Sequence, residues 1–127
     1  MREVVETGIP PTKSPLEWAV SADGVLYTAL IATKPDGSLD AGDITAQTTR
    51  TLDNLRQVVD AAGGTMADVN QGLIYLTDAA DAPAMNAVYR TYFDQPFPNR
   101  ATVVISALLA PGAIIEIVAY AHIGKSG

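Results

Sequence analysis

The chain has 127 residues, 48% of them hydrophobic, which predicts one domain, residues 1–127, with its own core. It has no cysteine and a single histidine, so disulfides, thiol nucleophiles and zinc sites built from several cysteines or histidines are excluded. The net charge of −6 disfavours nucleic acid as a partner, because a phosphate-binding surface needs positive charge.

The first 15 residues are polar and rich in proline, which indicates an extended segment. They lack the hydrophobic core of a signal peptide, and no apolar stretch in the chain approaches the roughly 20 residues that cross a bilayer. We therefore expect a cytoplasmic protein without a membrane partner.

Two short strand-like runs follow, at 18–20 and 25–31, and the Asp23-Gly24 pair between them predicts a hairpin. Apolar residues then recur at three- and four-residue steps from Ile44 to Ala62, which predicts a helix with one buried face. Asp43 is the expected N-cap, and Gly63-Gly64 the expected end of the helix.

The second half of the chain is expected to hold a strand at 72–77, a second helix from Asp81 to just before Pro96, and two strands at 101–107 and 114–122. The order is β-β-α-β-α-β-β, an α+β arrangement with both helices on one face of a mixed sheet. An apolar second face would be left bare, so we expect copies of the chain to associate through it.

Arg100 and Glu116 are the first candidates for chemistry. Arg100 follows a proline-flanked loop at the start of a strand, where a fixed guanidinium can bind a carboxylate; the alternative is an exposed arginine or an ion pair. Glu116 interrupts an apolar strand, which is costly unless the carboxylate faces water, a cation or a ligand; the alternative is a structural pair with an arginine. If the last two strands form a hairpin, Glu116 lies opposite Val103 or Val104, near Arg100 and Thr102 on one face.

Six segments of the sequence resemble the RidA/YjgF family, and together they extend over roughly residues 15–123. They are QTTRTLDNL (47–55), AAGGTMADV (61–69), YLTD (75–78), MNAVY (85–89), FPNRAT (97–102) and IEIVAYA (115–121). The GGTMADV run is similar to the RutC branch of that family, which handles aminoacrylate.

This resemblance implies a chorismate-mutase-like fold, a homotrimer with ligand clefts between subunits, and hydrolysis of enamines or imines such as 2-aminoacrylate to 2-keto acids and ammonia without a metal or organic cofactor. By position, Arg100 would bind the substrate carboxylate and Glu116 would orient or activate water. Thr102 stands where many members have cysteine, so its hydroxyl would lie near the ligand, and Leu30 would offer its backbone N–H. Asn86 matches a family asparagine that contacts the substrate; the alternative is an ordinary helix residue.

The sequence departs from the family near the start of the chain. Leu16 replaces a common tyrosine, Trp18 replaces a common glutamine and could wall the cleft, and Ala29-Leu30-Ile31 replaces Ser-Gly-Gln. These changes remove hydrogen-bonding groups, so we expect a tighter, more apolar pocket. Three hypotheses stay open: a deaminase for a small carboxylate-bearing imine, a non-catalytic binder of small carboxylates, and an enzyme of ring-compound breakdown.

Overall fold

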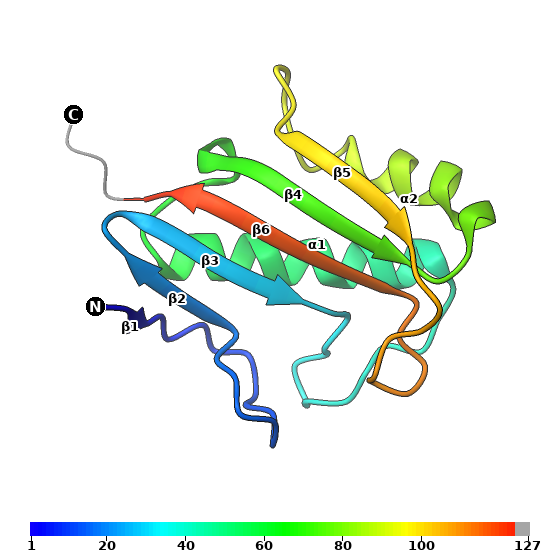
Figure 1. Cartoon of the computed structure of the whole chain (residues 1–127), viewed down its shortest axis with the longest axis horizontal. Helices are drawn as coiled ribbons and strands as arrows, with labels where there is room; N and C mark the ends of the chain where they lie inside the picture. The colour runs from blue at the N-terminus through cyan, green and yellow to red at the C-terminus, as the bar shows by residue number, and fades with distance from the viewer. Residues whose placement is uncertain (124–127) are drawn as a thin grey trace.

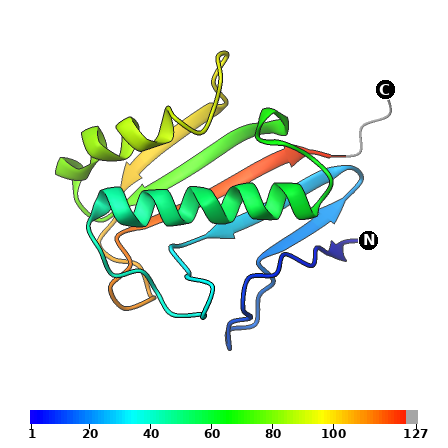
Figure 2. The same cartoon turned by 180° about the vertical axis from the view of Figure 1, so that it is seen from behind.

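A computed structural model describes residues 1–123 and shows one six-stranded mixed sheet with both helices on the same face (Figures 1 and 2). The expected α+β class is therefore confirmed, while residues 124–127 of the predicted domain lie outside the described part. The strands are β1 (Glu3–Val4), β2 (Ala19–Ala22), β3 (Val25–Leu30), β4 (Val69–Leu76), β5 (Asn99–Val104) and β6 (Ile115–His122). They lie in the order β1-β2-β3-β6-β4-β5.

The predicted hairpin is present between β2 and β3. Its two turn residues, Asp23 and Gly24, have φ of 53° and 79°, the left-handed pair that a two-residue hairpin turn requires. The extended N-terminal segment adds the short strand β1 at the edge, which the sequence did not predict.

The long helix α1 (Ile44–Ala61) has the predicted limits. The Asp43 carboxylate accepts a hydrogen bond from the Ala46 N–H at 2.9 Å, and Gly63 ends the helix with φ of +90°. The second helix, α2 (Ala82–Tyr89), is shorter than predicted, because the chain turns at residues 90–92, before the proline-containing loop.

The predicted hairpin between the last two strands is wrong. β5 pairs in parallel with β4, and β6 lies antiparallel between β3 and β4. The physical reason is that β4, α2 and β5 form a β-α-β unit, in which a helix returns the chain to the same end of the sheet. The loop at 105–114 then carries the chain past β4 to the start of β6 (Figure 1).

One buried amide connects the start of α1 with this loop. Gln47, 1% exposed, donates from Nε2 to the carbonyl oxygens of Gly42 and Gly112, at 3.2 and 2.9 Å. Its Oε1 accepts a hydrogen bond from the Ile114 N–H at 3.1 Å. The side chain thus fixes the backbone immediately before β6.

The helices cover only one of the two faces of the sheet. On the face under the helices, side chains of the central strands such as Ile74, Ile115 and Ile117 are at most 2% exposed and belong to the core. No helix of residues 1–123 covers the opposite face, which we call the open face (Figure 1). By strand alternation it carries these side chains: Tyr27, Ala29, Leu73, Tyr75, Ala101, Val103, Glu116, Val118 and Tyr120.

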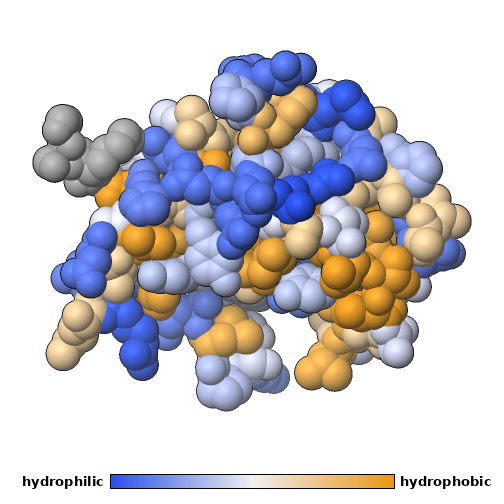
Figure 3. Space-filling model, turned by 45° about the horizontal axis from the view of Figure 1, so that its top comes forward, coloured by the Kyte–Doolittle hydropathy of each residue, from blue (hydrophilic) through white to orange (hydrophobic). Residues whose placement is uncertain are grey.

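Hydrophobic side chains reach the surface at the end of the molecule where β5 ends and β6 begins (Figure 3). Val103 is 46% exposed and Val104 53%, and Leu109 in the following loop is fully exposed. Large apolar groups in water at one end of a sheet with an uncovered face indicate a surface suited to association.

Candidate functional site

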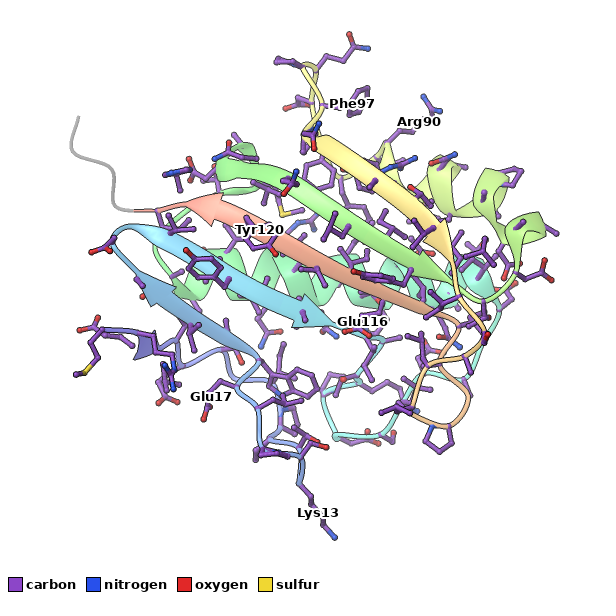
Figure 4. All side chains as sticks on the ribbon, in the orientation of Figure 1. Lys13, Glu17, Arg90, Phe97, Glu116 and Tyr120 are labelled. Carbon is purple, nitrogen blue, oxygen red and sulfur yellow. The ribbon has the colours of Figure 1, made fainter. Side chains whose placement is uncertain are left out.

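A shallow cavity of about 270 Å³ lies where the end of α2 meets the start of β5. Its lining comes from the end of α2 and from the segment that leads into β5: Asn86, Tyr89, Arg90, Phe97, Pro98 and Arg100. Figure 4 shows Arg90 and Phe97 at the same edge of the molecule, beside β5. Two of these six side chains are cationic and none is anionic, so the cavity is suited to a negatively charged ligand.

Arg100 is held in place by uncharged groups of α2. Its guanidinium carbon lies 4.7 Å from the centre of the Tyr89 ring, a cation–π contact, and its Nη1 lies 4.0 Å from Sδ of Met85. Burial raises the pKa of the Tyr89 hydroxyl, and the nearby Arg100 charge partly opposes that rise. These contacts orient the guanidinium but leave its charge unneutralised.

Neither expected ion pair is present within residues 1–123. No carboxylate there lies within 4.0 Å of the Arg100 guanidinium, and Glu116 contacts no cationic side chain. The ion-pair alternative therefore does not apply to Arg100 or to Glu116 in residues 1–123, whereas Arg100 is partly exposed, as the other alternative for that residue expects. Both charged groups are available for a ligand or a second chain.

Glu116 lies on the open face, near the start of β6 (Figure 4). Its side chain is half-buried, and its neighbour across the strand pair is Tyr75 of β4. Burial raises the pKa of the Glu116 carboxyl, because removal from water disfavours the charged form. A carboxyl group whose pKa moves toward neutrality is better suited to transferring protons.

The expectation that Arg100 and Glu116 share one face of the sheet within a chain is wrong. Arg100 pairs with Gly72 of β4 and points toward α2, whereas Glu116 pairs with Tyr75 on the open face. Glu116 is level with Val103, as predicted, but β4 lies between the two strands. The incorrect hairpin caused the error, because a changed strand partner changes which side chains meet.

The predicted site residues divide into two groups in the structure. Thr102, two residues after Arg100, shares its face of β5, and Asn86 lines the same cavity. Trp18 directly precedes β2, which lies near the edge of the sheet opposite to β5. Its Nε1 donates a hydrogen bond to the Pro10 carbonyl at 2.8 Å. Leu30, at the end of β3, is 2% exposed in the core, so only its backbone can face a ligand.

Sequence reasoning missed four of the six residues that line the cavity: Tyr89, Arg90, Phe97 and Pro98. Tyr89 stood only within the MNAVY segment (85–89) of the family resemblance, yet its ring supports the Arg100 guanidinium. Arg90 was not singled out, although it directly follows Tyr89 and lines the cavity. The available signal was the i, i+3 and i, i+4 spacing from Asn86, which places all three residues near one side of a helix end.

Residues 1–123 contain no group of three or more acidic or histidine side chains placed to hold a metal ion. Within the same residues, neither helix has the length and apolar character needed to cross a bilayer.

Comparison with known proteins gives consistent matches over nearly the whole chain. The model of a family described as endoribonuclease L-PSP matches residues 9–123. Over 122 residues the chain is 35% identical to 3-aminoacrylate deaminase RutC of Acinetobacter baylyi, which covers 94% of this chain and 96% of that protein.

Solved structures match equally well. The crystal structure of YyfA, a Rid family protein of Yersinia pestis, has a TM-score of 0.90 and 33% identity, covering 97% of this chain and all of the other. E. coli TdcF with bound serine has a TM-score of 0.87 and 27% identity, covering 98% and 99% of the two chains.

Proposed function

Because the chain belongs to the RidA/YjgF proteins, the family whose model is described as endoribonuclease L-PSP, we propose that it is an enamine/imine deaminase. Its substrate is a small imine that carries a carboxylate and resembles 2-aminoacrylate. Water adds to the carbon of the C=N bond, the C–N bond breaks, and a 2-keto acid and ammonia are released. The named activity of the RutC relative supports this reaction class.

The observation that carries the proposal is an oriented arginine without a counter-ion. Arg100 lies at the cavity between α2 and β5, fixed by Tyr89 and Met85, with no carboxylate partner in residues 1–123. A guanidinium presents paired N–H donors that match a carboxylate, so Arg100 binds and orients the substrate. Thr102 and Asn86 add hydrogen-bonding groups on the same side of the sheet.

Glu116 supplies the proton-transfer group in this proposal. Its half-buried carboxyl, with a pKa raised by burial, orients the attacking water, accepts a proton from it and returns a proton to the leaving nitrogen. No cofactor takes part, because the C=N carbon is already electrophilic and the nucleophile is water.

The site is completed by a second copy of the chain. Arg100 and Glu116 lie on opposite faces of the sheet in one chain, so they meet only if Arg100 of one subunit approaches Glu116 of its neighbour. The same contact brings Trp18 and the Leu30 backbone toward the arginine group. Exposed Tyr27 and Val103 on the open face favour such association, and we propose a homotrimer with the ligand at each subunit interface.

Mixed oligomers test the reaction and the shared site together. Arg100→Ala and Glu116→Gln are each expected to lack activity toward imines generated by an amino-acid oxidase, measured as keto-acid release above the spontaneous rate. Co-expressed in equal amounts, they are expected to recover about a quarter of the wild-type activity, since one interface in four receives an intact residue from each chain by random assembly.

One control mixture and two further measurements make the test decisive. Mixing Arg100→Ala with the double variant Arg100→Ala/Glu116→Gln restores nothing, because no chain then supplies the arginine. If the protein sediments as a monomer at micromolar concentration and is fully active there, the site is not shared between two chains. Micromolar keto-acid binding in calorimetry without any turnover contradicts the proposed enzyme activity. That result supports a second candidate function, a non-catalytic binder of small carboxylates. The second candidate is favoured by Ala29 on the open face, which has no hydroxyl group to contact a substrate.

A further inference from the structure

Arg90 places a second positive charge at the cavity that holds Arg100. It is the C-cap residue of α2, exposed, and directly follows Tyr89, whose ring supports the Arg100 guanidinium. A cation at a helix C-terminus is favourable in itself, but that role does not need the residue to line a cavity. Its backbone N–H donates to the carbonyl oxygens of Asn86, at 3.1 Å, and Val88, whereas its guanidinium makes no hydrogen bond or ion pair within residues 1–123.

The charges of this cavity are unbalanced. Its two guanidinium groups face no acidic side chain in the lining, in a protein whose net charge is −6. The carboxylate next to the imine carbon neutralises one arginine by a paired hydrogen-bond contact. One cation then remains, together with the apolar walls formed by Phe97 and Pro98.

We propose that the substrate carries a second carboxylate, which Arg90 binds. This inference rests on the deaminase function proposed above and specifies its substrate class: imines of dicarboxylic amino acids, such as iminosuccinate and 2-iminoglutarate. Arg100 binds the carboxylate beside the imine carbon, and the distal carboxylate reaches Arg90 at the rim. The cavity, at about 270 Å³, is near the lower end of small-molecule sites, which suits a short dicarboxylate.

The test compares matched imines with one and two carboxylates. D-aspartate oxidase generates the dicarboxylate imines from D-aspartate and D-glutamate, and D-amino-acid oxidase generates monocarboxylate imines from D-alanine and D-norvaline. In wild-type protein we expect a higher kcat/KM for the dicarboxylate imines. Arg90→Gln is expected to lower the ratio of dicarboxylate to monocarboxylate kcat/KM about tenfold or more, and Arg90→Lys to restore part of it.

Lys13→Gln is the matched control, because it removes one exposed positive charge at the opposite end of the molecule (Figure 4). It changes the net charge as Arg90→Gln does and is expected to leave the substrate ratio unchanged. An equal fall in the ratio for both variants means that Arg90 acts only through long-range charge, and it overturns the proposal.

Calorimetry with reaction products separates this inference from the proposed function. Tighter binding of oxaloacetate or 2-oxoglutarate than of pyruvate, lost in Arg90→Gln, supports the second carboxylate site even if no imine is hydrolysed. Hydrolysis of the monocarboxylate imines with a ratio that Arg90→Gln does not change rejects the dicarboxylate site and leaves the deaminase function standing.

Discussion

The cavity at α2 and β5 and the open face around Glu116 are incomplete in different ways. At the cavity, helix residues hold the Arg100 guanidinium in position, and what is missing is a negative charge. On the open face, Glu116 is half-buried among strand side chains, and what is missing is cover and a cation. Each region supplies what the other lacks, although one chain cannot bring them together.

The largest expected effect separates the role of the acid from that of the arginine. Glu116→Gln keeps the size of the side chain but removes its ability to exchange protons, so kcat is expected to fall about 10²- to 10⁴-fold. Keto-acid affinity, measured by calorimetry, should stay near the wild-type value. If Glu116→Gln lost as much keto-acid affinity as Arg100→Ala, both regions would bind the carboxylate, and the separate roles of the acid and the arginine would be disproved.

Arg100→Ala is expected to act mainly on binding. Losing a charge-assisted, paired contact weakens keto-acid affinity by about a hundredfold, which calorimetry measures directly. The Arg100→Lys variant keeps the charge but not the planar fork, and it is expected to recover only part of the affinity. Wild-type affinity in Arg100→Ala would show that the cavity is not the carboxylate site.

Substitutions at two adjacent residues of β6 test how the two faces of the sheet differ, because their side chains point to opposite faces. Ile117→Val removes one methylene from the covered core and is expected to lower the free energy of unfolding by about 1 kcal/mol, measured with urea. Val118→Thr, on the open face, is expected to weaken subunit association in sedimentation more than it lowers the stability of the dissociated chain. Equal effects of both changes on unfolding alone would argue against an interface there.

The smallest effect concerns pH. Burial raises the folded-state pKa of Glu116 above the ordinary value of about 4.3 for glutamate, so the folded chain binds this proton more tightly than the unfolded chain. Its contribution favours folding at low pH and is lost as pH rises through the raised pKa. In the dissociated chain, where no neighbouring Arg100 lies near Glu116, the Glu116→Gln variant should therefore gain stability relative to wild type as the pH rises from 4 to 7, measured by urea titration. The opposite trend would indicate a cationic partner for Glu116.

The local features of the fold could be predicted from the sequence, and one long-range pairing could not. The period of apolar residues defined α1, and Asp23-Gly24 defined the β2–β3 turn, because both signals arise between near neighbours in the chain. The partner of β5 was mistaken, although a strand, a helix and a strand in succession favour parallel pairing. That single pairing decided which candidate residues share a face.

Of the predicted site residues, Arg100 and Asn86 line the cavity, but the predicted arrangement of Arg100 and Glu116 on one face of the sheet is wrong. Arg100 stood out because it follows a proline-flanked loop at the start of a strand, and Glu116 because a carboxylate in an apolar strand needs an explanation. Arg90 did not, because an arginine at the end of a helix is ordinary in sequence, and only the cavity gives it a neighbour of the same charge. A site divided between two copies of the chain, as proposed above, would also leave no local pattern in one sequence.

The Gln47 amide has a consequence for how the loop between β5 and β6 can change. By holding the Gly112 carbonyl and the Ile114 N–H, it anchors the last residues of that loop to the helix layer. Insertions in the loop before Gly112 can therefore change the surface at that end of the sheet without shifting Glu116, which lies two residues after Ile114. The sequence of this loop is free to vary while the Glu116 carboxyl keeps its position.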